Sequence, residues 1–233
     1  MEKMSKEIEI EINADQLRLT FLKYTKKAFE MLPRIDKPRI LDIGCGSGVP
    51  TLELARLSNG EIIGIDIDQT ALDELNKNAR KLGLSNRVKA INCSLFEIEF
   101  PDESFDIIWG EGVLAPIGFE RALKEWRRLL KINGFMVLHD DLQNKERKLK
   151  IIPECGYVLM NHFQLPDDAW WTEYYEPLEK RINEVRTKYK DDPKVLEAVK
   201  KYQTEINTYR KNPSAFRSIF YILQKITNPR VLH

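Results

Sequence analysis

The segment from Arg39 to Arg56 constrains the fold more than any other part of the chain, because it predicts a buried strand, a turn and the start of a helix. An apolar run precedes the turn, and leucine and alanine recur after it at helical spacing. The turn contains Gly44, Gly46 and Gly48, which lack a β-carbon, so a ligand can approach the backbone closely. Because free N–H groups at a helix start attract a carboxylate or phosphate, the turn predicts a binding site for a nucleoside ligand.

The spacing of the glycines argues against a dinucleotide. The dinucleotide-binding pattern is Gly-x-Gly-x-x-Gly, but here Gly46 is followed three residues later by Val49. Two acidic residues accompany the turn: Asp42 in the first strand and Asp66 at the end of a second strand. A carboxylate in the latter position accepts hydrogen bonds from ribose hydroxyls. Asp42 would repel a pyrophosphate and suits a ligand that carries an ammonium group near a carboxylate.

A tight strand-to-helix connection that binds no ligand would show some of the same features. Asp66 could then cap the following helix, as Asp68 could. Asp42, Asp66 and the three glycines together favour the ligand-binding interpretation.

The turn and three later features resemble the class I S-adenosylmethionine-dependent methyltransferases, in particular the ubiquinone/menaquinone-biosynthesis-like and methyltransferase-domain group. Asp42 to Gly48 resembles motif I of that family, and Asp66 matches its ribose-binding acid. Phe100–Trp109 matches the family's fourth strand and the approach to it, and Leu129–Phe135 resembles the Leu-Lys-Pro-Gly-Gly turn before the fifth. The resemblance implies S-adenosylmethionine as the cofactor, held by Asp42, Gly44, Gly46, Gly48, Asp66, Ile67, Ser94, Leu95 and Gly110.

The chain departs from the family pattern at two places. The family often has an aspartate after its third strand, where it meets the adenine amino group, and this chain has Ser94 there, preceded by Cys93. A serine can still form a hydrogen bond with the base. Ile132 and Asn133 replace Pro-Gly before the fifth strand, and asparagine tolerates the left-handed geometry of such a turn.

Strand-like and helix-like patterns alternate along most of the chain. This alternation predicts a doubly wound α/β fold with a mostly parallel sheet and right-handed crossovers. The family resemblance implies seven strands in a Rossmann-like sheet, with the last strand antiparallel. We expect the strands at Arg39–Ile43, Glu61–Asp66, Arg87–Asn92, Phe105–Trp109, Phe135–His139, Gly156–Leu165 and Ala215–Lys225.

We expect a single domain with four parts. An N-terminal arm and cover helix occupy residues 1–35, with a strand-like alternation at Glu7–Ile12 and a helix at Leu17–Leu32 over the ligand site. The cofactor-binding core covers 36–165, and the last strand lies in 215–225. A helical insertion, 166–214, contains two helices broken at Asp191–Pro193. Its apolar stripes could form a lid over the substrate, a dimer surface or plain extra packing.

Composition excludes several classes of protein. The 233 residues carry a net charge of +1, so there is no global attraction to nucleic acid or to an anionic membrane. The chain shows no signal-peptide pattern and no apolar run of about 18 residues, so we expect a cytoplasmic protein without a membrane partner. Its three cysteines lack the spacing of a disulfide framework or a zinc site. A monomer or a homodimer is expected.

Ligands of doubly wound sheets bind beyond the carboxyl ends of the strands, which nominates two catalytic candidates. Glu111 lies between two glycines after the fourth strand and could orient an amine or accept a proton, or it could simply cap a turn. His139 ends the fifth strand and could act as a base near neutral pH, or it could be a satisfied core residue. His139, Asp140 and Asp141 lack a further spaced ligand, so no metal is assigned.

Aromatic residues cluster at the start of the insertion. Trp170, Trp171 and Tyr174 lie beside two glutamates, and such a wall could bind a cationic or flat apolar substrate. The alternative is that these rings anchor the inserted helices. We therefore take Trp170, Trp171 and Tyr174 as candidate substrate-binding residues.

These observations favour a methyltransferase that acts on a small-molecule acceptor. The Asn-Pro-Pro-Tyr type of motif found in amine-modifying nucleic-acid enzymes of this family is absent after the fourth strand, so nucleic acid is an unlikely substrate. One alternative is a methyltransferase for protein or RNA, supported by the basic segment Lys145–Lys150. Another is a module that binds S-adenosylmethionine without catalysis.

Overall fold

The computed structural model describes residues 11–190 and 192–227. Its internal contacts divide the chain into two compact units. Among the described residues, the helical unit comprises 11–21 and 165–217, and the sheet unit comprises Leu22–Gln164 and 218–227. Within the described part of the chain, no helix is long and apolar enough to cross a membrane.

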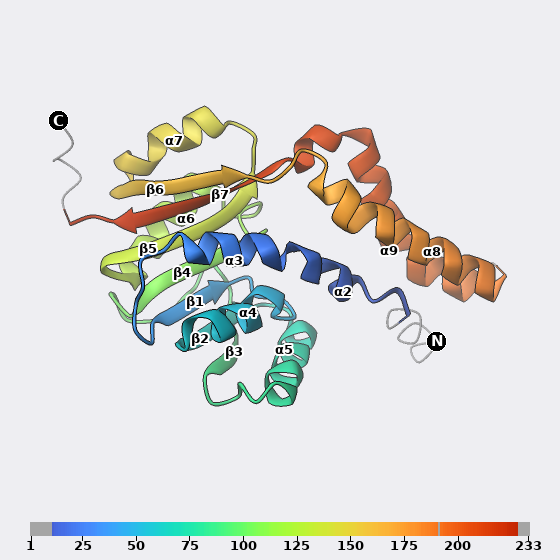
Figure 1. Ribbon diagram of the computed structural model, residues 1–233, viewed down its shortest axis with the longest axis horizontal. Helices are drawn as coiled ribbons and strands as arrows, with labels where there is room; N and C mark the ends of the chain where they lie inside the picture. The colour runs from blue at the N-terminus through green and yellow to red at the C-terminus, as the bar shows by residue number, and fades with distance from the viewer. Residues whose placement is uncertain (1–10, 191, 228–233) are drawn as a thin grey trace. The chain divides into compact units, whose positions relative to one another are not determined.

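The sheet unit is built on one seven-stranded sheet with the order β3-β2-β1-β4-β5-β7-β6 (Figure 1). Strands β1 to β5 run parallel, and β7 runs antiparallel to both of its neighbours. The predicted doubly wound fold with an antiparallel last strand is therefore confirmed. The strands are β1 Arg39–Ile43, β2 Glu61–Asp66, β3 Val88–Asn92, β4 Phe105–Glu111, β5 Leu130–Asp141, β6 Tyr157–Gln164 and β7 Ser218–Lys225.

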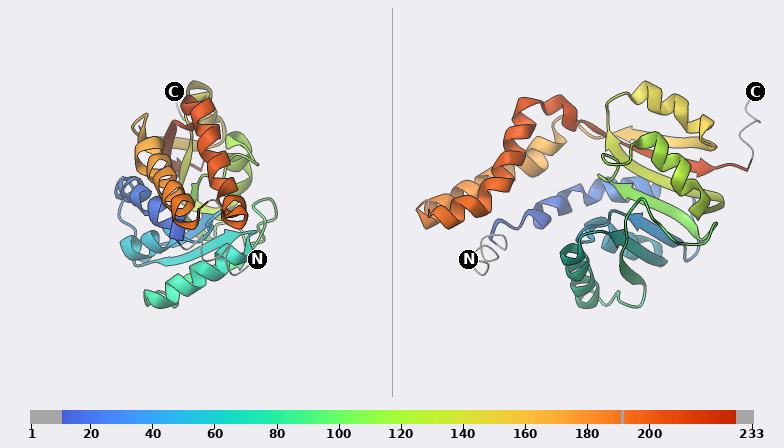
Figure 2. Two further views of the ribbon diagram at one scale, coloured as in Figure 1. Left: turned by 90° about the vertical axis from the view of Figure 1, so that its right-hand side faces the viewer. Right: turned by 180° about the vertical axis from the view of Figure 1, so that it is seen from behind.

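Helices cover both faces of the sheet, as right-handed crossovers require (Figures 1 and 2). Helices α3 (Leu22–Glu30), α4 (Val49–Ser58) and α5 (Gln69–Lys81) pack on one face. Helices α6 (Phe119–Trp126) and α7 (Lys145–Glu154) pack on the other, where α6 lies nearest the viewer when the molecule is seen from behind. Trp126 is buried in the core between α6 and the sheet, as its place in the apolar stripe predicts.

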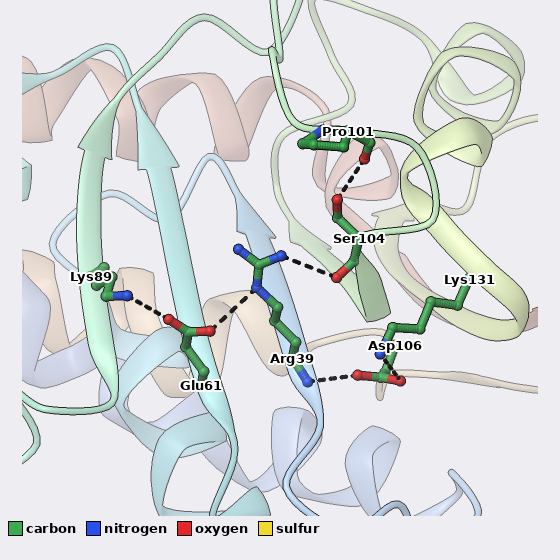
Figure 3. A network of polar contacts seen from close by, with 7 residues as sticks. All are labelled: Arg39, Glu61, Lys89, Pro101, Ser104, Asp106 and Lys131. Carbon is green, nitrogen blue, oxygen red and sulfur yellow. Dashed lines mark hydrogen bonds and ion pairs between the residues drawn. The ribbon is translucent and has the colours of Figure 1, made fainter.

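A polar network joins the strands at the amino-terminal edge of the sheet (Figure 3). The Glu61 carboxylate pairs with Lys89 at 2.6 Å and with Arg39 at 3.2 Å, linking the three strands β3, β2 and β1. The carboxylate of Asp106 in β4 accepts from the backbone N–H of Arg39 at 2.8 Å and pairs with Lys131 of β5 at the same distance. These contacts support the strand register at the edge opposite the glycine turn.

The helical unit has an apolar core of its own. Its elements are α2 (Ala14–Arg18), two 3₁₀ turns at Leu19–Phe21 and Pro213–Phe216, a π-helical turn at Trp171–Tyr175, α8 (Glu176–Tyr189) and α9 (Pro193–Lys211). The break between the two inserted helices is confirmed, since Asp192 caps α9 through the N–H of Lys194. The apolar stripes face one another in a core of Ile12, Leu17, Tyr174, Tyr175, Leu178, Ile182, Val185, Val195, Val199, Tyr202, Ile206 and Tyr209.

Two expectations about the N-terminal part need correction. Residues 7–10 of the expected strand lie outside the described residues, and Glu11 and Ile12 are helical, so the strand prediction is wrong for these two. The helix expected at Leu17–Leu32 is interrupted at Leu19–Phe21 and ends at Glu30, before Pro33. The alternation of glutamate and isoleucine did not indicate a strand there, because Ile12 is buried in a helical core.

Candidate cofactor-binding site

The glycine turn folds back onto the end of the second strand. The backbone N–H groups of Gly44 and Cys45 donate to the carbonyl oxygen of Ile65 at 2.8 and 3.0 Å. The N–H of Gly46 donates to Oδ2 of Asp66 at 2.8 Å. The two segments singled out in the sequence therefore form one structure at the carboxyl edge of the sheet.

The three glycines of the turn all have a positive φ but differ in their surroundings, and a β-carbon on Gly44 would lie 2.5 Å from Cγ2 of Val113. Gly48 has a φ of +84°, and a β-carbon on it would lie 2.2 Å from Cδ1 of Leu75 in α5, so a side chain would drive the two helices apart. Gly46 has a φ of +51°, but a β-carbon there would meet nothing within 4 Å. The turn is thus closely packed at Gly44 and at Gly48 and open between them at Gly46.

Asp66 is placed to serve both the fold and a ligand. Its Oδ2 accepts from Gly46, and its Oδ1 accepts from the N–H of Asp68 at 2.9 Å. A carboxylate oxygen can accept more than one hydrogen bond, so each oxygen retains capacity for a ligand hydroxyl. The helix N-cap is Asp68, whose Oδ1 accepts from Thr70 and Ala71, so Asp66 is not needed for that role.

A cavity of about 310 Å³ opens beside this turn. Five of the predicted cofactor residues line this cavity. Ile65, Phe96 and Val113 also line it, although the sequence did not indicate them as site residues. Ile67 is 74% exposed and Phe96 is 44% exposed, which leaves two apolar side chains available for a flat ring. The cavity is lined by Gly44, Ile65, Asp66, Ile67, Cys93, Ser94, Leu95, Phe96, Gly112, Val113 and Pro116.

Asp42 and Gly110 are predicted cofactor residues that do not line the cavity. Asp42 is buried in β1, and Oγ1 of Thr51 in α4 donates to its Oδ2 at 2.6 Å. Burial raises the pKa of Asp42 to about 7, and the carboxylates of Glu111 and Asp66 act in the same direction. Gly110 is buried within β4. A cation near Asp42 would favour its ionised form.

Glu111, a candidate catalytic residue, is held by two donors. Nε1 of Trp109 donates to its Oε1 at 2.7 Å, and Oγ1 of Thr25 in α3 donates to the same oxygen at 2.9 Å. Burial raises the pKa of Glu111 to about 7 despite these hydrogen bonds. The carboxyl group therefore joins α3 to the end of β4, and Glu111 does not line the cavity described above.

His139, the other candidate, lies opposite Glu111 in the pairing of β4 with β5. Its ring stacks on Phe220 of β7, with the centroids 4.5 Å apart and the planes 15° apart. Burial lowers the pKa of His139 to about 4, so the imidazole is neutral at physiological pH. His139 does not line the cavity either, and the catalytic roles of both residues stay predictions.

The candidate substrate-binding aromatics belong to the helical unit. Trp170 packs on Phe21 with the ring centroids 4.5 Å apart, and Trp171 stacks on Tyr209 at 5.5 Å. Tyr174 is buried, whereas the two tryptophans are partly exposed. The structure thus gives these rings a packing role within the unit, and their contact with a substrate stays a prediction.

The sequence matches a family described as "methyltransferase domain" over residues 36–205, which is most of the chain. The chain belongs to this methyltransferase family. The resemblance to class I S-adenosylmethionine-dependent methyltransferases, noted from the glycine turn and three later features, is confirmed.

Two curated relatives are methyltransferases by name. A sterol 24-C-methyltransferase of Gibberella zeae is 28% identical over 138 residues, which cover 54% of this chain and 36% of the relative. The 27-O-demethylrifamycin SV methyltransferase of Amycolatopsis mediterranei is 30% identical over 119 residues, which cover 51% of this chain and 44% of the relative. The chain therefore spans less than half the length of these two relatives.

A solved structure supports the fold assignment. The S-adenosylmethionine-dependent methyltransferase of Thiobacillus denitrificans, in complex with S-adenosyl-L-homocysteine, has a TM-score of 0.71 with this chain at 18% identity. The match covers 87% of this chain and 91% of that chain. The class I methyltransferase fold is thus seen across most of both molecules.

The residues of this methyltransferase fit a nucleoside that carries an amino acid. Asp66 offers acceptors for ribose hydroxyls, and the open tip of the turn at Gly46 leaves room for close approach. Ile67 and Phe96 provide apolar surface for a base. Burial raises the pKa of Asp42 to about 7, and an ammonium group bound near it would favour its ionised form. These are the groups that S-adenosylmethionine requires.

Proposed function

We propose that this protein transfers the methyl group of S-adenosylmethionine to a small-molecule acceptor. One observation carries the proposal. The glycine turn is hydrogen-bonded to Asp66 beside a cavity of about 310 Å³, and apolar side chains also line this cavity. Membership of the methyltransferase family supports the reaction.

When bound, the cofactor supplies an electrophilic methyl group on a sulfonium. The protein must then hold the acceptor about 3 to 3.5 Å from the methyl carbon and in line with the leaving sulfur. We assign Asp66 to orient the ribose, Ile67 and Phe96 to contact the base, and Asp42 to attract the ammonium group. These groups orient the cofactor for transfer, and a general base is needed only when the acceptor starts protonated.

Two considerations support a small acceptor. The relatives described above are named for sterol and rifamycin substrates, which are small molecules. The basic segment that favoured RNA is partly neutralised within the protein, because Nζ of Lys148 lies 2.7 Å from Asp140 and 3.0 Å from Asp141. A nearly neutral chain likewise gives little general attraction to RNA.

Titration calorimetry with S-adenosylhomocysteine tests the cofactor part of the proposal. We expect saturable binding with one ligand per chain, and no heat at millimolar ligand would refute it. Methyl transfer from radiolabelled S-adenosylmethionine to a panel of sterols, polyketides and amines tests the acceptor. Label recovered only in RNA or protein would contradict a small acceptor, and cofactor binding without transfer to any compound would indicate a binding module.

A further inference from the structure

The side chains of Asp42 and Glu111 point to the same face of the sheet. Asp42 lies opposite Trp109 in the pairing of β1 with β4, and Nε1 of Trp109 donates to Oε1 of Glu111 at 2.7 Å. Residues paired across two strands share a face, as do residues two apart in one strand. Gly44 and Gly112, which follow the two acids in the chain, line the cofactor cavity, so both carboxyl groups belong to strand ends that support it.

The partners of the two carboxyl groups are neutral. Oγ1 of Thr51 in α4 donates to Asp42 at 2.6 Å, and Oγ1 of Thr25 in α3 donates to Glu111 at 2.9 Å. Asp42 is only 2% exposed, and the charged groups that act on it are the carboxylates of Glu111 and Asp66. The surroundings therefore add negative charge to Asp42 and no compensating positive charge.

Other titratable groups on the neighbouring elements do not reverse this balance. His139, opposite Glu111 in β5, is neutral because burial lowers its pKa to about 4. Burial also raises the pKa of the Cys45 thiol, which keeps it uncharged. The charged side chains of α3 and α4 contact other groups. Lys23 lies over Tyr24, Lys26 pairs with Glu30, Lys27 lies over Phe163, and Arg56 pairs with Glu53.

Two neighbouring carboxyl groups without a cation retain a proton that a pair with a cation would lose. Burial disfavours the charged form of each acid, and the charge of one disfavours ionisation of the other, so the protons leave in steps that belong to the pair. The pKa of each acid is accordingly raised to about 7. A positive charge that arrives nearby favours the ionised form and so expels the proton.

We propose that Glu111 is a positioning residue that acts through Asp42: the two carboxyl groups hold a proton between them in the free protein, and the positive charge of the bound cofactor releases it to the solvent. The full negative charge of the pair then develops only when the cofactor is present. Because linkage is reciprocal, affinity for the cofactor rises with pH through the neutral range. The inference rests on the proposed function, since it concerns the charged part of the same cofactor.

Calorimetric titration of the full chain at pH 7, in buffers of different ionisation enthalpy, counts the protons released per ligand. S-adenosylhomocysteine carries an ammonium group and is expected to release about 0.3 to 1 proton per chain. 5′-Methylthioadenosine has the same nucleoside without the ammonium group and is expected to release none. Equal release by the two ligands, or no release by S-adenosylhomocysteine, would overturn the inference.

Two variants separate the charge of Glu111 from its structural contacts. Glu111→Gln keeps an oxygen that can accept from Thr25 and Trp109 but carries no charge, so Asp42 is more fully ionised in the free protein. Proton release by S-adenosylhomocysteine at pH 7 is expected to fall by at least about half, and the gain in affinity from pH 6 to pH 7.5 to become smaller. Glu61→Gln removes a carboxylate at the opposite edge of the sheet and is expected to change neither quantity.

The outcomes distinguish this inference from the function on which it rests. If Glu111→Gln releases as many protons as the original protein, Glu111 does not act through Asp42 and the assignment is wrong. The comparison of the two ligands uses only the original protein, so it decides the question even if Glu111→Gln fails to fold. If neither ligand binds the original protein, the proposed function itself fails, which is a different result from binding without proton release.

Discussion

Two buried carboxyl groups lie close to the cofactor site, and each is held by a threonine hydroxyl. Asp42 accepts from Thr51, and Glu111 accepts from Thr25. The pKa of both acids is raised to about 7, chiefly by burial, and the Glu111 charge contributes to the shift of Asp42. Each residue therefore joins a covering helix to the sheet and also responds to charge nearby.

The raised pKa of Asp42 makes folding stability depend on pH. An unfolded aspartate has a pKa near 3.8, so between about pH 4 and 7 the folded state binds more protons, and stability falls as pH rises through this window. Replacing Asp42 by Asn removes this contribution while the amide oxygen can still accept from Thr51. We expect calorimetric melting temperatures from pH 5 to 8 to fall less steeply with pH in Asp42→Asn than in the original protein.

Two other groups serve to check that result. The pKa of His139 is lowered to about 4, so its imidazole is neutral in the folded protein. Its contribution to folding stability is therefore lost as pH falls below about 6.5. This pH dependence is opposite in sign to that of Asp42. Because His139 is present in both proteins, its effect cancels when the melting-temperature slopes of Asp42→Asn and the original protein are compared. Glu61, whose pKa is lowered by Lys89, gives a control: Glu61→Gln should leave the slope above pH 5 unchanged. If the melting temperatures of Asp42→Asn and the original protein change equally with pH, the raised pKa of Asp42 is contradicted.

Asp66 and Asp68 give a second prediction at the scale of single residues. Asp66→Asn removes charged acceptors for the ribose, each worth about 1.5 to 3 kcal/mol, so affinity for S-adenosylhomocysteine should fall at least about tenfold in calorimetric titration. Asp68→Asn is the matched control, because asparagine caps a helix as well as aspartate does. Its affinity should stay within about threefold, and a similar loss in both variants would mean that the ribose lies elsewhere.

At the scale of the secondary-structure elements, the glycine turn gives a steric prediction, because Gly46 and Gly48 differ in the space around a β-carbon. Ala at position 46 would adopt a left-handed conformation with open space around its β-carbon, and should cost about 1 to 2 kcal/mol of stability. Ala at position 48 has the same backbone cost. Its β-carbon would also collide with Leu75 of α5, which adds about 1 to 3 kcal/mol to the loss of stability. Urea unfolding of Gly46→Ala and Gly48→Ala measures the difference. Equal destabilisation would show that α4 and α5 can move apart freely.

The sequence predicts some elements exactly and others only in part. β1 and β2 have the predicted bounds, because their apolar runs end at turns with clear signals. The sequence predicts β5 at Phe135–His139, but the strand begins at Leu130. Exposed residues interrupt the apolar run after Leu130. The backbone nevertheless pairs with β4 at Leu130 and again from Phe135, on either side of a bulge. Asn133 lies there with a φ of +62°, the left-handed geometry expected of asparagine.

The candidate site shows the same division between local and tertiary information. Asp66 ends β2 and Ser94 follows β3, so their place at the carboxyl edge could be inferred from the order of strands. Phe96 and Val113 were missed, because the direction of an apolar side chain in a loop depends on the loop's hydrogen bonds. The exposure of a phenylalanine so near Ser94 is a signal that only the structure reveals.

For the whole molecule, the structure changes the interpretation of the insertion. The sequence predicts that its apolar stripes form a lid over the substrate, a dimer surface or plain extra packing. Within the helical unit they pack on each other and on Leu17 of α2. Tyr174 is buried in this core, and Trp170 and Trp171 pack against it, while a role of these rings or of the insertion at a substrate stays a prediction.

Two separate cores imply two separate cooperative responses, because local stability follows the contacts within each unit. Ile206 of α9 and Leu41 of β1 are both fully buried, one in each core. Truncating either to Ala should cost about 2 to 5 kcal/mol. Hydrogen exchange measured by mass spectrometry should speed up chiefly in α8 and α9 for Ile206→Ala and chiefly in β1 to β5 for Leu41→Ala. Uniform acceleration of exchange in both variants would instead mean that the chain unfolds as one unit. In that case, S-adenosylhomocysteine would protect the amides of both units equally. With two separate units, it would protect chiefly the amides around Asp66.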